Sequence, residues 1–439
     1  LSGKHIILAG AGISSLSFAI SLHKLWPSLS NSNPRSTPPR LTLYDRDSSA
    51  APAGREGYSL SIRSDAPSAG VQTLLKMGML EPMLERAVTS IGDEEEGSEK
   101  GGFVVWDHGW REVLKVRSKV PVGCPVSGMR VSRKALRQTL VEAAEELEGV
   151  EIIWGTAITG LSPAPSADRG ISTGNGNGDI LVHLSNSHTA TCDLLIDASG
   201  SSSKPRTLLR PTDTLQFAGP VVIAGTCPLS TSPSTSSHDY GMILPGTGHC
   251  LFIAPINSTG LGWALSWKQG DPVTPKKQPL EVDEVVALLE EARQKGVPAF
   301  GPRFAQMLDQ TQKGSVMMFN AMDKPGFAHT SDPTYITSPS PALQSLAGKV
   351  VFLGDANHAV SPFAGNGANL AIMDGWAFAE ALVQSTDAEE ALKRYDGVAV
   401  RKAEKVVRMS HFVIRVAHSG GWALWGWMWV LRLLRLLFF

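Results

Sequence analysis

Cysteine is scarce in this chain of 439 residues. The four cysteines, Cys124, Cys192, Cys227 and Cys250, lie far apart and form no Cys-x-x-Cys pair. This spacing argues against a zinc site and favours free thiols in a reducing compartment. We therefore expect no bound metal and a cytoplasmic location.

The sequence also lacks an excess of charge of either sign. Its 40 Lys and Arg residues nearly balance its 41 Asp and Glu residues, and the net charge of -1 gives no electrostatic basis for binding nucleic acid. We identify no secretory signal before the first predicted strand. The length exceeds that of one typical domain, and a hydrophobic content of 42% is enough to bury a large core.

The most informative segment runs from Val350 to Gly375 and reads VVFLGDANHAVSPFAGNGANLAIMDG. Its apolar start predicts a short buried strand that ends near Asp355, and a helix is predicted to begin near Ala368 after a turn. Unpaired amides around Asn366 and Gly367 would favour negative charge on a ligand. Asp355 could accept hydrogen bonds from the hydroxyls of a sugar or ribityl chain. The segment therefore predicts a nucleotide cofactor site.

A glycine-rich turn follows the first predicted strand, His5 to Leu8. Gly10 permits a tight turn, and Gly12 allows the backbone to approach a pyrophosphate. Ser15 stands where this pattern has its third glycine, and serine is small enough for close helix packing. The acidic residue that should hold a ribose about 20 residues later appears further on, as Asp45.

The delay before Asp45 has a visible cause in the sequence. Leu29 to Pro39, which is rich in Ser, Asn and Pro, is predicted to be a loop between the first helix and the second strand. A tight turn in an unrelated α/β domain would give a similar glycine pattern. The position of the turn at the start of the chain, together with Asp45, favours a dinucleotide.

Together these segments resemble the motifs of FAD-dependent monooxygenases of the para-hydroxybenzoate hydroxylase type. The late segment is similar to the GD motif of that family, in which the aspartate, here Asp355, holds the ribityl chain of FAD. The resemblance covers most of the chain from Lys4 to Leu382. It implies an α/β fold with a Rossmann-like FAD-binding domain, an inserted antiparallel β-sheet substrate domain and a C-terminal helical segment.

A third family element lies in the middle of the chain. Asp193 to Gly200 resembles the DG motif of the family, although Ser199 stands where the family usually has Asp. Ser203 and Arg206 match the trailing Ser and Arg of this motif. In the family, the missing acid is implicated in contacts to FAD and to the nicotinamide donor. Its absence leaves open how strongly or how fast this chain uses NADPH or NADH.

The resemblance assigns candidate residues to the cofactor. The expected FAD contacts are Gly10, Gly12, Ser14, Ser15, Asp45, Arg46, Arg133, Gly354, Asp355, Gly365, Asn366, Gly367 and Ala368. A solvated helix arginine is an equal alternative for Arg133. Pro362 and Gly365 are the catalytic candidates, because in this family the proline stacks near the reactive face of the flavin and the nearby amides stabilise charge on the reduced ring. His358 is interpreted as a structural residue of the turn.

The resemblance also divides the chain into domains. We expect residues 1–210 and 343–385 to form the FAD-binding domain, residues 211–342 the substrate domain, and residues 386–439 C-terminal helices. Strands in series between Phe217 and Lys268 predict the antiparallel sheet. Ordinary core packing is the alternative for each of the candidate substrate-pocket residues, which are Tyr58, Ser61, Met242, Phe252, Trp263, Trp267 and Phe363.

The C-terminal end, from Trp422 to Phe439, is dominated by Trp and Leu. A membrane-spanning helix needs about 20 mostly apolar residues, and Arg432 and Arg435 interrupt this run. Contact with a membrane surface and packing against the substrate domain or a second subunit are the alternatives. Similar tails occur in fungal secondary-metabolism members of the family, which favours that subgroup.

The resemblance implies an enzyme that uses FAD, NADPH or NADH, and O2. Such an enzyme would hydroxylate or epoxidise an electron-rich aromatic or alkaloid-like natural product through a flavin C4a-hydroperoxide. One alternative is an FAD-dependent oxidase or cyclase of the same fold that inserts no oxygen. Another is a non-catalytic flavin-binding protein.

Overall fold

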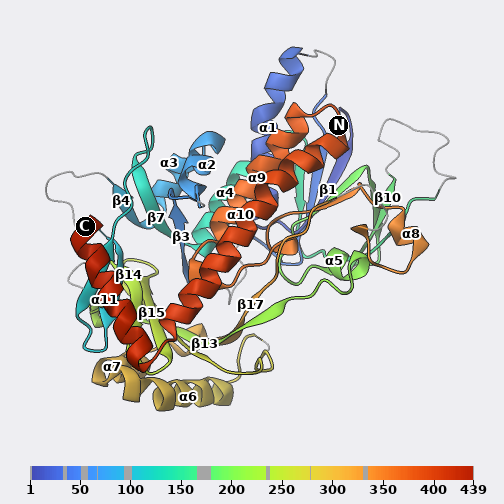
Figure 1. Ribbon diagram of the computed structural model, residues 1–439. Helices are drawn as coiled ribbons and strands as arrows, with labels where there is room; N and C mark the ends of the chain where they lie inside the picture. The colour runs from blue at the N-terminus through green and yellow to red at the C-terminus, as the bar shows by residue number, and fades with distance from the viewer. Residues whose placement is uncertain are drawn as a thin grey trace.

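The computed structural model describes residues 2–32, 37–50, 58–66, 68–92, 101–165, 179–233, 238–276, 278–329 and 335–438. Within these ranges the strands form four sheets, and the helices cover their faces (Figure 1). The C-terminal helices run across the molecule from the parallel sheet toward the largest antiparallel sheet (Figure 1).

A parallel sheet carries the two motifs read from the sequence. Its order is β18-β12-β1-β2-β8, and every neighbouring pair is parallel. The strands are β1 (His5–Ala9), β2 (Arg40–Tyr44), β8 (Val150–Ile153), β12 (Leu194–Asp197) and β18 (Val350–Phe352). Strands β1, β12 and β18 are buried along their whole length, which is typical of parallel strands covered on both faces. The predicted Rossmann-like core is confirmed.

Helix α1 (Ile13–Ser32) follows β1, and α9 (Gly367–Gln384) follows the late turn. The two helices lie side by side over the parallel sheet, with α4 (Arg133–Glu145) also packed against α1 (Figure 1). Gly375 makes the contact close, because a Cβ there would lie 2.6 Å from the backbone nitrogen of Phe18. The rings of Phe18 and Phe378 stack with centroids 5.6 Å apart.

The predicted loop between the first helix and the second strand is wrong at its beginning. Residues 29–32 continue helix α1. Extending an existing helix fixes only one residue per added hydrogen bond, so local Ser and Asn residues need not end it. Residues 33–36 of that loop lie outside the described residues.

The largest sheet is mostly antiparallel and has the order β17-β13-β16-β15-β14-β5-β6. Its strands are β5 (Phe103–Asp107), β6 (Glu112–Val116), β13 (Gln216–Pro228), β14 (Tyr240–Leu244), β15 (His249–Pro255), β16 (Gly260–Lys268) and β17 (Met317–Asp323). The predicted antiparallel series is confirmed for β13 to β16. Strands β5 and β6 were not expected here, since they come from the segment assigned to the FAD-binding domain, and β5 pairs with β14 in parallel.

Two helices cover one face of this sheet, α6 (Val282–Phe300) and α7 (Pro302–Asp309) (Figure 1). The core beneath them is aromatic, because the ring of Trp263 meets the ring of Phe304 edge-on at 5.6 Å. The opposite face, toward the rest of the molecule, carries side chains of mixed size, from Ala264 and Ser266 to Met242 and Phe252. A cavity opens on this side, which faces the parallel sheet.

The remaining elements are shorter. One three-stranded sheet joins β3 (Ser59–Arg63), β7 (Val126–Ser132) and β4 (Ala87–Gly92), and another joins β9 (Ile158–Pro163), β10 (Ile180–Leu184) and β11 (Thr189–Cys192). The short helices are α2 (Gly70–Met77), α3 (Leu80–Glu85), α5 (Lys204–Leu209) and α8 (Pro341–Gln344). Asn369 in the first turn of α9 ties the first of these sheets to the late turn, since its side chain bonds the backbone of Ser61 and Arg63.

The chain ends in α10 (Ala388–Ala417) and α11 (Gly421–Phe438). One face of α11 packs Leu424 and Met428 against the β5, β6 and β14 end of the large sheet. The other face leaves Trp422 and Trp425 exposed, at 86% and 59%. Among the described residues, no helix is both long and apolar enough to cross a membrane.

We predict that Gly375→Ala destabilises the protein. The added methyl group would press on the backbone of α1, and overpacking of this kind costs about 1–3 kcal/mol of the free energy of unfolding. Thermal unfolding and FAD content would measure the effect. Gly397→Ala in α10 is the matched control, because its Cβ would meet nothing within 4 Å. Equal stability of the two variants would contradict the close contact.

Candidate active site

A cavity of about 1110 Å³ runs between the parallel sheet and the large antiparallel sheet. Ligand pockets typically have roughly 300–1,000 Å³, so this cavity has room for an extended cofactor and a further small molecule. Its walls come from the β1–α1 turn, the late turn before α9, the β3-β7-β4 sheet and the inner face of the large sheet. The two motif segments therefore open into one space.

The β1–α1 turn forms one end of the cavity. Gly10 has φ 90°, and a Cβ there would lie 3.0 Å from the carbonyl oxygen of Ala198, so only glycine fits. Gly12 precedes the first turn of α1, where backbone amides lack helical partners. This arrangement suits the pyrophosphate of a dinucleotide.

Asp45, the predicted ribose residue, is held in place by the protein. Its Oδ2 accepts a hydrogen bond of 2.7 Å from the Ala11 amide and lies 3.0 Å from Arg137 Nη2. Arg137 also lies 2.7 Å from Asp47 Oδ2, and its Nε donates to the Ala11 carbonyl at 2.9 Å. Arg137 was not among the site residues predicted from the sequence. Two features of the sequence could have identified it: Arg137 lies one helical turn after Arg133, and two acids, Asp45 and Asp47, follow β2.

Asp355 also lines the cavity, in a 3-10 turn (Gly354–Ala356) that lies beside Ser14 in the first turn of α1. Asp355 is exposed to the space of the cavity. The protein atoms around it reduce the solvation of its carboxylate, which raises the pKa of Asp355 to about 6. The charges of His358, Arg133 and Arg206 act in the opposite direction. Arg206 also fixes the turn, since its Nη1 donates to the Ala356 carbonyl at 3.0 Å.

His358 has a structural position. It is fully buried, and its Nε2 lies 2.7 Å from Asp374 Oδ2. Burial acts to lower the pKa of His358, but the Asp374 carboxylate outweighs burial and raises it. Asp374 also accepts a hydrogen bond of 2.9 Å from the Gly354 amide. This pair therefore anchors the strand end to α9.

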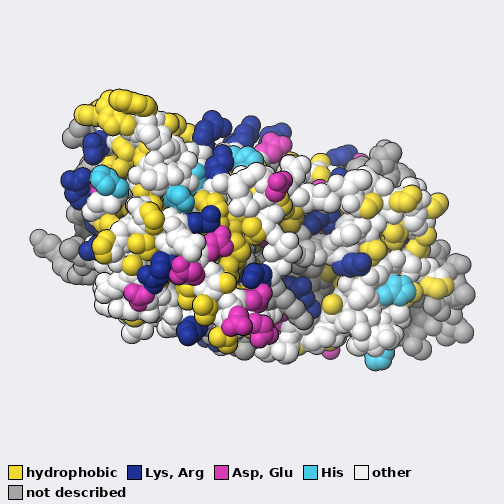
Figure 2. Space-filling model, turned by 90° about the horizontal axis from the view of Figure 1, so that it is seen from below, with side chains coloured by type: hydrophobic (Ala, Val, Ile, Leu, Met, Phe, Trp, Pro, Cys, Tyr) yellow, Lys and Arg dark blue, Asp and Glu magenta, His cyan; other side chains and the backbone are white. Residues whose placement is uncertain are grey.

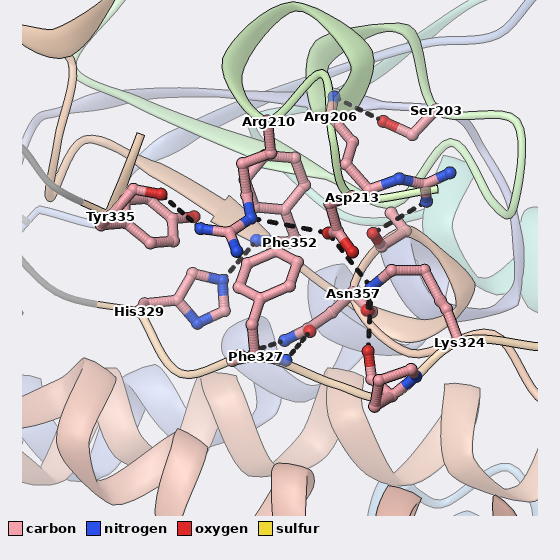
Figure 3. A network of polar contacts seen from close by, with 12 residues as sticks. Ser203, Arg206, Arg210, Asp213, Lys324, Phe327, His329, Tyr335, Phe352 and Asn357 are labelled. Atoms are coloured by element: carbon pink, nitrogen blue, oxygen red, sulfur yellow. Dashed lines mark hydrogen bonds and ion pairs between the residues drawn. The ribbon is translucent and has the colours of Figure 1, made fainter. Parts of the chain in front are cut away.

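A polar network joins Lys324, Asp213 and Asn357, which follows the Asp355 turn in the chain (Figure 3). The side chain of Lys324 is fully buried, and its Nζ lies 3.2 Å from Asp213 and donates to the Asn357 carbonyl. Burial lowers the pKa of Lys324 to about 8, with the Asp213 charge opposing this effect. Asn357 exchanges two hydrogen bonds with the backbone of Phe327, of 2.9 and 3.1 Å. The network fixes the turn without entering the cavity.

The segment from Pro362 to Ala368 forms part of the cavity wall. Pro362–Ala364 is a 3-10 turn, and Gly365 continues it with φ 62°. Asn366 is the N-cap residue of α9 but provides no side-chain cap, because its side chain bonds Ser68 and the Ala364 carbonyl. The first amides of α9 are therefore available to a ligand with negative charge.

Ser199 lines the cavity at the end of β12. Its hydroxyl donates to Asp197 Oδ1 at 2.5 Å, and Ser203 donates to the other carboxylate oxygen. Burial raises the pKa of Asp197, while these hydrogen bonds and the Arg206 charge oppose the rise. The position at which the resembled family usually has an acid therefore presents a hydroxyl group.

Most predicted site residues line this cavity. They are Gly10, Gly12, Ser14, Asp45, Arg46, Tyr58, Ser61, Arg133, Met242, Phe252, Trp263, Asp355, Pro362, Phe363, Gly365, Asn366, Gly367 and Ala368. Ser15 and Gly354 lie behind the wall, where Ser15 is fully buried in α1 and a Cβ at Gly354 would clash with Ser14.

Trp267 is a correction, since it does not line the cavity. Side chains alternate between the two faces of a strand, and the sequence alone does not say which face of β16 meets the cavity. Trp263 and Trp267 point their side chains into the core under α6 and α7, although Trp263 still touches the cavity. The residues of β16 that open toward the cavity are the small ones, Gly262, Ala264 and Ser266.

Comparison with known proteins agrees with this geometry. A family model of an FAD-binding domain matches residues 342–410. The monooxygenase cfoF of Aspergillus candidus is 31% identical over 422 residues, which cover 95% of this chain and 92% of that protein. The FAD-dependent monooxygenase aptC of Emericella nidulans is 25% identical over 393 residues, which cover 82% of this chain and 86% of that protein.

A solved structure shows the same fold. Klebsiella pneumoniae HpxO, in complex with FAD and uric acid, aligns with a TM-score of 0.68 at 16% identity, covering 98% of this chain and 92% of that chain. The relatives cfoF and aptC are monooxygenases, and the matching family model is that of an FAD-binding domain. Both matches confirm the predictions that the chain is an enzyme and that its cofactor is FAD. This chain therefore belongs to the family of FAD-dependent monooxygenases.

Proposed function

We propose that this enzyme uses NADPH or NADH and O2 to insert one oxygen atom into an electron-rich aromatic or alkaloid-like natural product. The observation that carries the proposal is the continuity of the cavity, which joins both cofactor turns to a chamber under the large sheet. Met242 and Phe252 line this chamber on the sheet side. Such a chamber suits a flat, largely apolar substrate.

The residues of both turns fit FAD. The glycines of the β1–α1 turn leave room for the pyrophosphate beside the amides of α1. Asp45, held by Ala11 and Arg137, would accept hydrogen bonds from the ribose on its remaining lone pairs. Asp355 would accept hydrogen bonds from the ribityl hydroxyls. When bound, FAD supplies hydride acceptance and the activation of dioxygen.

The chain itself would supply charge stabilisation and a dry environment. The amides from Gly365 to Gly367 lie at the start of α9, where they would stabilise negative charge on the reduced ring. Pro362, Phe363 and Ala364 form an apolar part of the wall that would exclude water from the reacting centre. At Ser199 the nicotinamide donor would meet a hydroxyl instead of a carboxylate.

Product mass tests the reaction. The purified holoenzyme would be mixed with NADPH or NADH under air and a set of aromatic and alkaloid-like compounds, and oxygen uptake would be recorded. We expect a product that is heavier by one oxygen atom. A product with two fewer hydrogens or unchanged mass would instead support an oxidase or cyclase, the alternative that the loss of the family acid at Ser199 keeps open. No turnover with any donor would contradict both.

Asp355 generates a pH prediction for cofactor affinity. An ionised carboxylate accepts stronger hydrogen bonds than a protonated one, and the pKa of Asp355 is raised to about 6. FAD affinity should therefore weaken as the pH falls through about 6. Asp355→Asn should weaken FAD binding by about tenfold to hundredfold at neutral pH and remove this pH dependence.

Flavin fluorescence during titration of the apoprotein would measure both effects. Asp309→Asn, in an exposed ion pair with Arg293, is the matched control and should leave the FAD affinity unchanged. An Asp355→Asn variant with the affinity and pH profile of the wild type would remove Asp355 from the cofactor site.

We also propose that the exposed face of α11 contacts an anionic membrane surface. Trp422, Trp425, Trp429 and Leu433 are exposed at 54% or more along one side of this helix. The described part of α11 has no acidic residue, and the Arg432 guanidinium lies 5.9 Å from the centre of the Trp429 ring. Figure 2 shows hydrophobic side chains gathered at the upper left, with Lys and Arg beside them. Trp next to Arg suits lipid headgroups.

Vesicle sedimentation tests the α11 surface. We expect the wild type to sediment with vesicles that contain phosphatidylserine. The double variant Trp425→Ser and Trp429→Ser should bind at least about tenfold more weakly, because burying a large apolar side chain contributes roughly 1.5–3 kcal/mol. Val282→Ser, also exposed, is the control. Self-association of the wild type without vesicle binding would show an interface between copies and contradict the proposal. The cytoplasmic location stays a prediction.

A further inference from the structure

Arg130 lies in the cavity wall on β7, where the β3-β7-β4 sheet meets the large sheet. Its guanidinium donates to Ser61 Oγ at 2.7 Å, to the Ser59 carbonyl at 2.7 Å and to Ser59 Oγ. It also lies over two aromatic rings, 4.8 Å from the centre of Tyr240 and 5.9 Å from that of Phe252. These partners hold the cation firmly but are all neutral.

Arg130 differs from the other cations of the cavity. The cationic residues in the wall are Arg46, Arg63, Arg130, Arg133, Arg137 and Lys204. Arg137 is buried and contacts two carboxylates, and Arg63 pairs with Asp65 at 2.6 Å. Arg130 is only 3% exposed, and no carboxylate among the described residues pairs with it. Its buried Nε has no hydrogen-bond partner in the described part of the chain.

Burying a cation without an anion beside it is unfavourable for the free energy of folding. Charged groups removed from water are normally paired, and serine oxygens with ring faces compensate only in part. Burial lowers the pKa of Arg130 to about 10, which still leaves the guanidinium charged at neutral pH. The charge therefore persists inside a cavity that admits a ligand, and a ligand with an anionic oxygen would complete the pair.

The position of Arg130 places its charge in the part of the cavity proposed for the substrate. Its contacts come from β3, β14 and β15, and none of its hydrogen bonds involves the turn from Pro362 to Ala368. The cofactor turn is close by, because Ser61, which accepts from Arg130, also accepts from Asn369 in the first turn of α9 through its carbonyl. An anion at Arg130 would thus lie beside the proposed flavin position.

We propose that Arg130 determines substrate specificity by binding an anionic oxygen of the substrate, such as a phenolate, an enolate or a carboxylate. The inference rests on the proposed function and narrows its substrate class. The ionisable group releases its proton to solvent, and the guanidinium stabilises the remaining anion. For a phenol or enol, ionisation also enriches the neighbouring carbon in electrons, which favours attack on an electrophilic oxygen.

Binding of small chromophoric probes tests the proposal without turnover. The FAD-loaded enzyme would be titrated with 4-nitrophenol and with its neutral ether, 4-nitroanisole, across a pH series around the pKa of free 4-nitrophenol. Difference spectra report the phenolate, and equilibrium dialysis gives the affinities. We expect the wild type to prefer the phenolate by about tenfold to hundredfold and to lower the pKa of the bound probe. A parallel pair, benzoate and methyl benzoate, distinguishes a carboxylate from a phenolate as the preferred anion.

Variants separate specificity from folding. Arg130→Gln should lose most of the preference and the pKa effect, and Arg130→Lys should keep part of both, because it retains the charge without the planar fork. Arg86→Gln, in an exposed pair with Glu142, should match the wild type. The proposal is wrong if the wild type binds both neutral probes, 4-nitroanisole and methyl benzoate, as tightly as the matching anions. It is also wrong if Arg130→Gln weakens FAD binding and leaves the probe preference intact, since Arg130 would then serve the cofactor.

The two proposals fail in different ways. An enzyme that selects the phenolate but adds no oxygen to any product would contradict the proposed reaction and leave the role of Arg130 standing. An enzyme that adds oxygen equally well to compounds with and without an acidic group would support the reaction and contradict the role of Arg130.

Discussion

The close packing of α1 against α9 is the constraint on which the site depends. Gly375 lets the two helices approach so closely that any side chain there would meet the backbone of α1. Gly354 faces Ser14 with a similar lack of space. Because α1 begins after the first glycine turn and α9 begins after the late turn, this packing brings two helix N-termini to one cavity. Two sources of positive potential, far apart in sequence, can then act on one elongated anionic cofactor.

Buried charges fix the geometry around that cavity. Arg137 bridges Asp45 and Asp47 after β2, while Lys324 with Asp213 supports the turn that carries Asp355. Buried ion pairs contribute little net stability compared with apolar packing, but removal of one partner leaves an uncompensated charge. We interpret these clusters as devices that hold the cofactor residues in place. Arg130 is the exception, since its neutral surroundings leave a charge for a ligand to balance.

The sequence predicts the strand–turn–helix segments that line the cavity because their signals are local. A strand followed by a glycine turn and a helix occupies consecutive residues, so Gly10, Asp355 and Gly365 could be placed from the sequence. Contacts between segments that are far apart in the sequence are harder to predict from it. The parallel pairing of β5 with β14 joins distant segments, and alternation alone could not say which face of β16 meets the cavity. No sequence motif marks Arg130, because only the folded structure shows that no carboxylate of the described residues lies beside it.

Hydrogen–deuterium exchange of the protein with and without FAD tests the central claim most directly. If one cofactor is held by both helix N-termini, the amides of residues 10–15 and those of residues 354–368 will gain protection together at the same FAD concentration. Protection of only one of these segments, or of neither, would contradict an account in which α1 and α9 act on a single bound flavin.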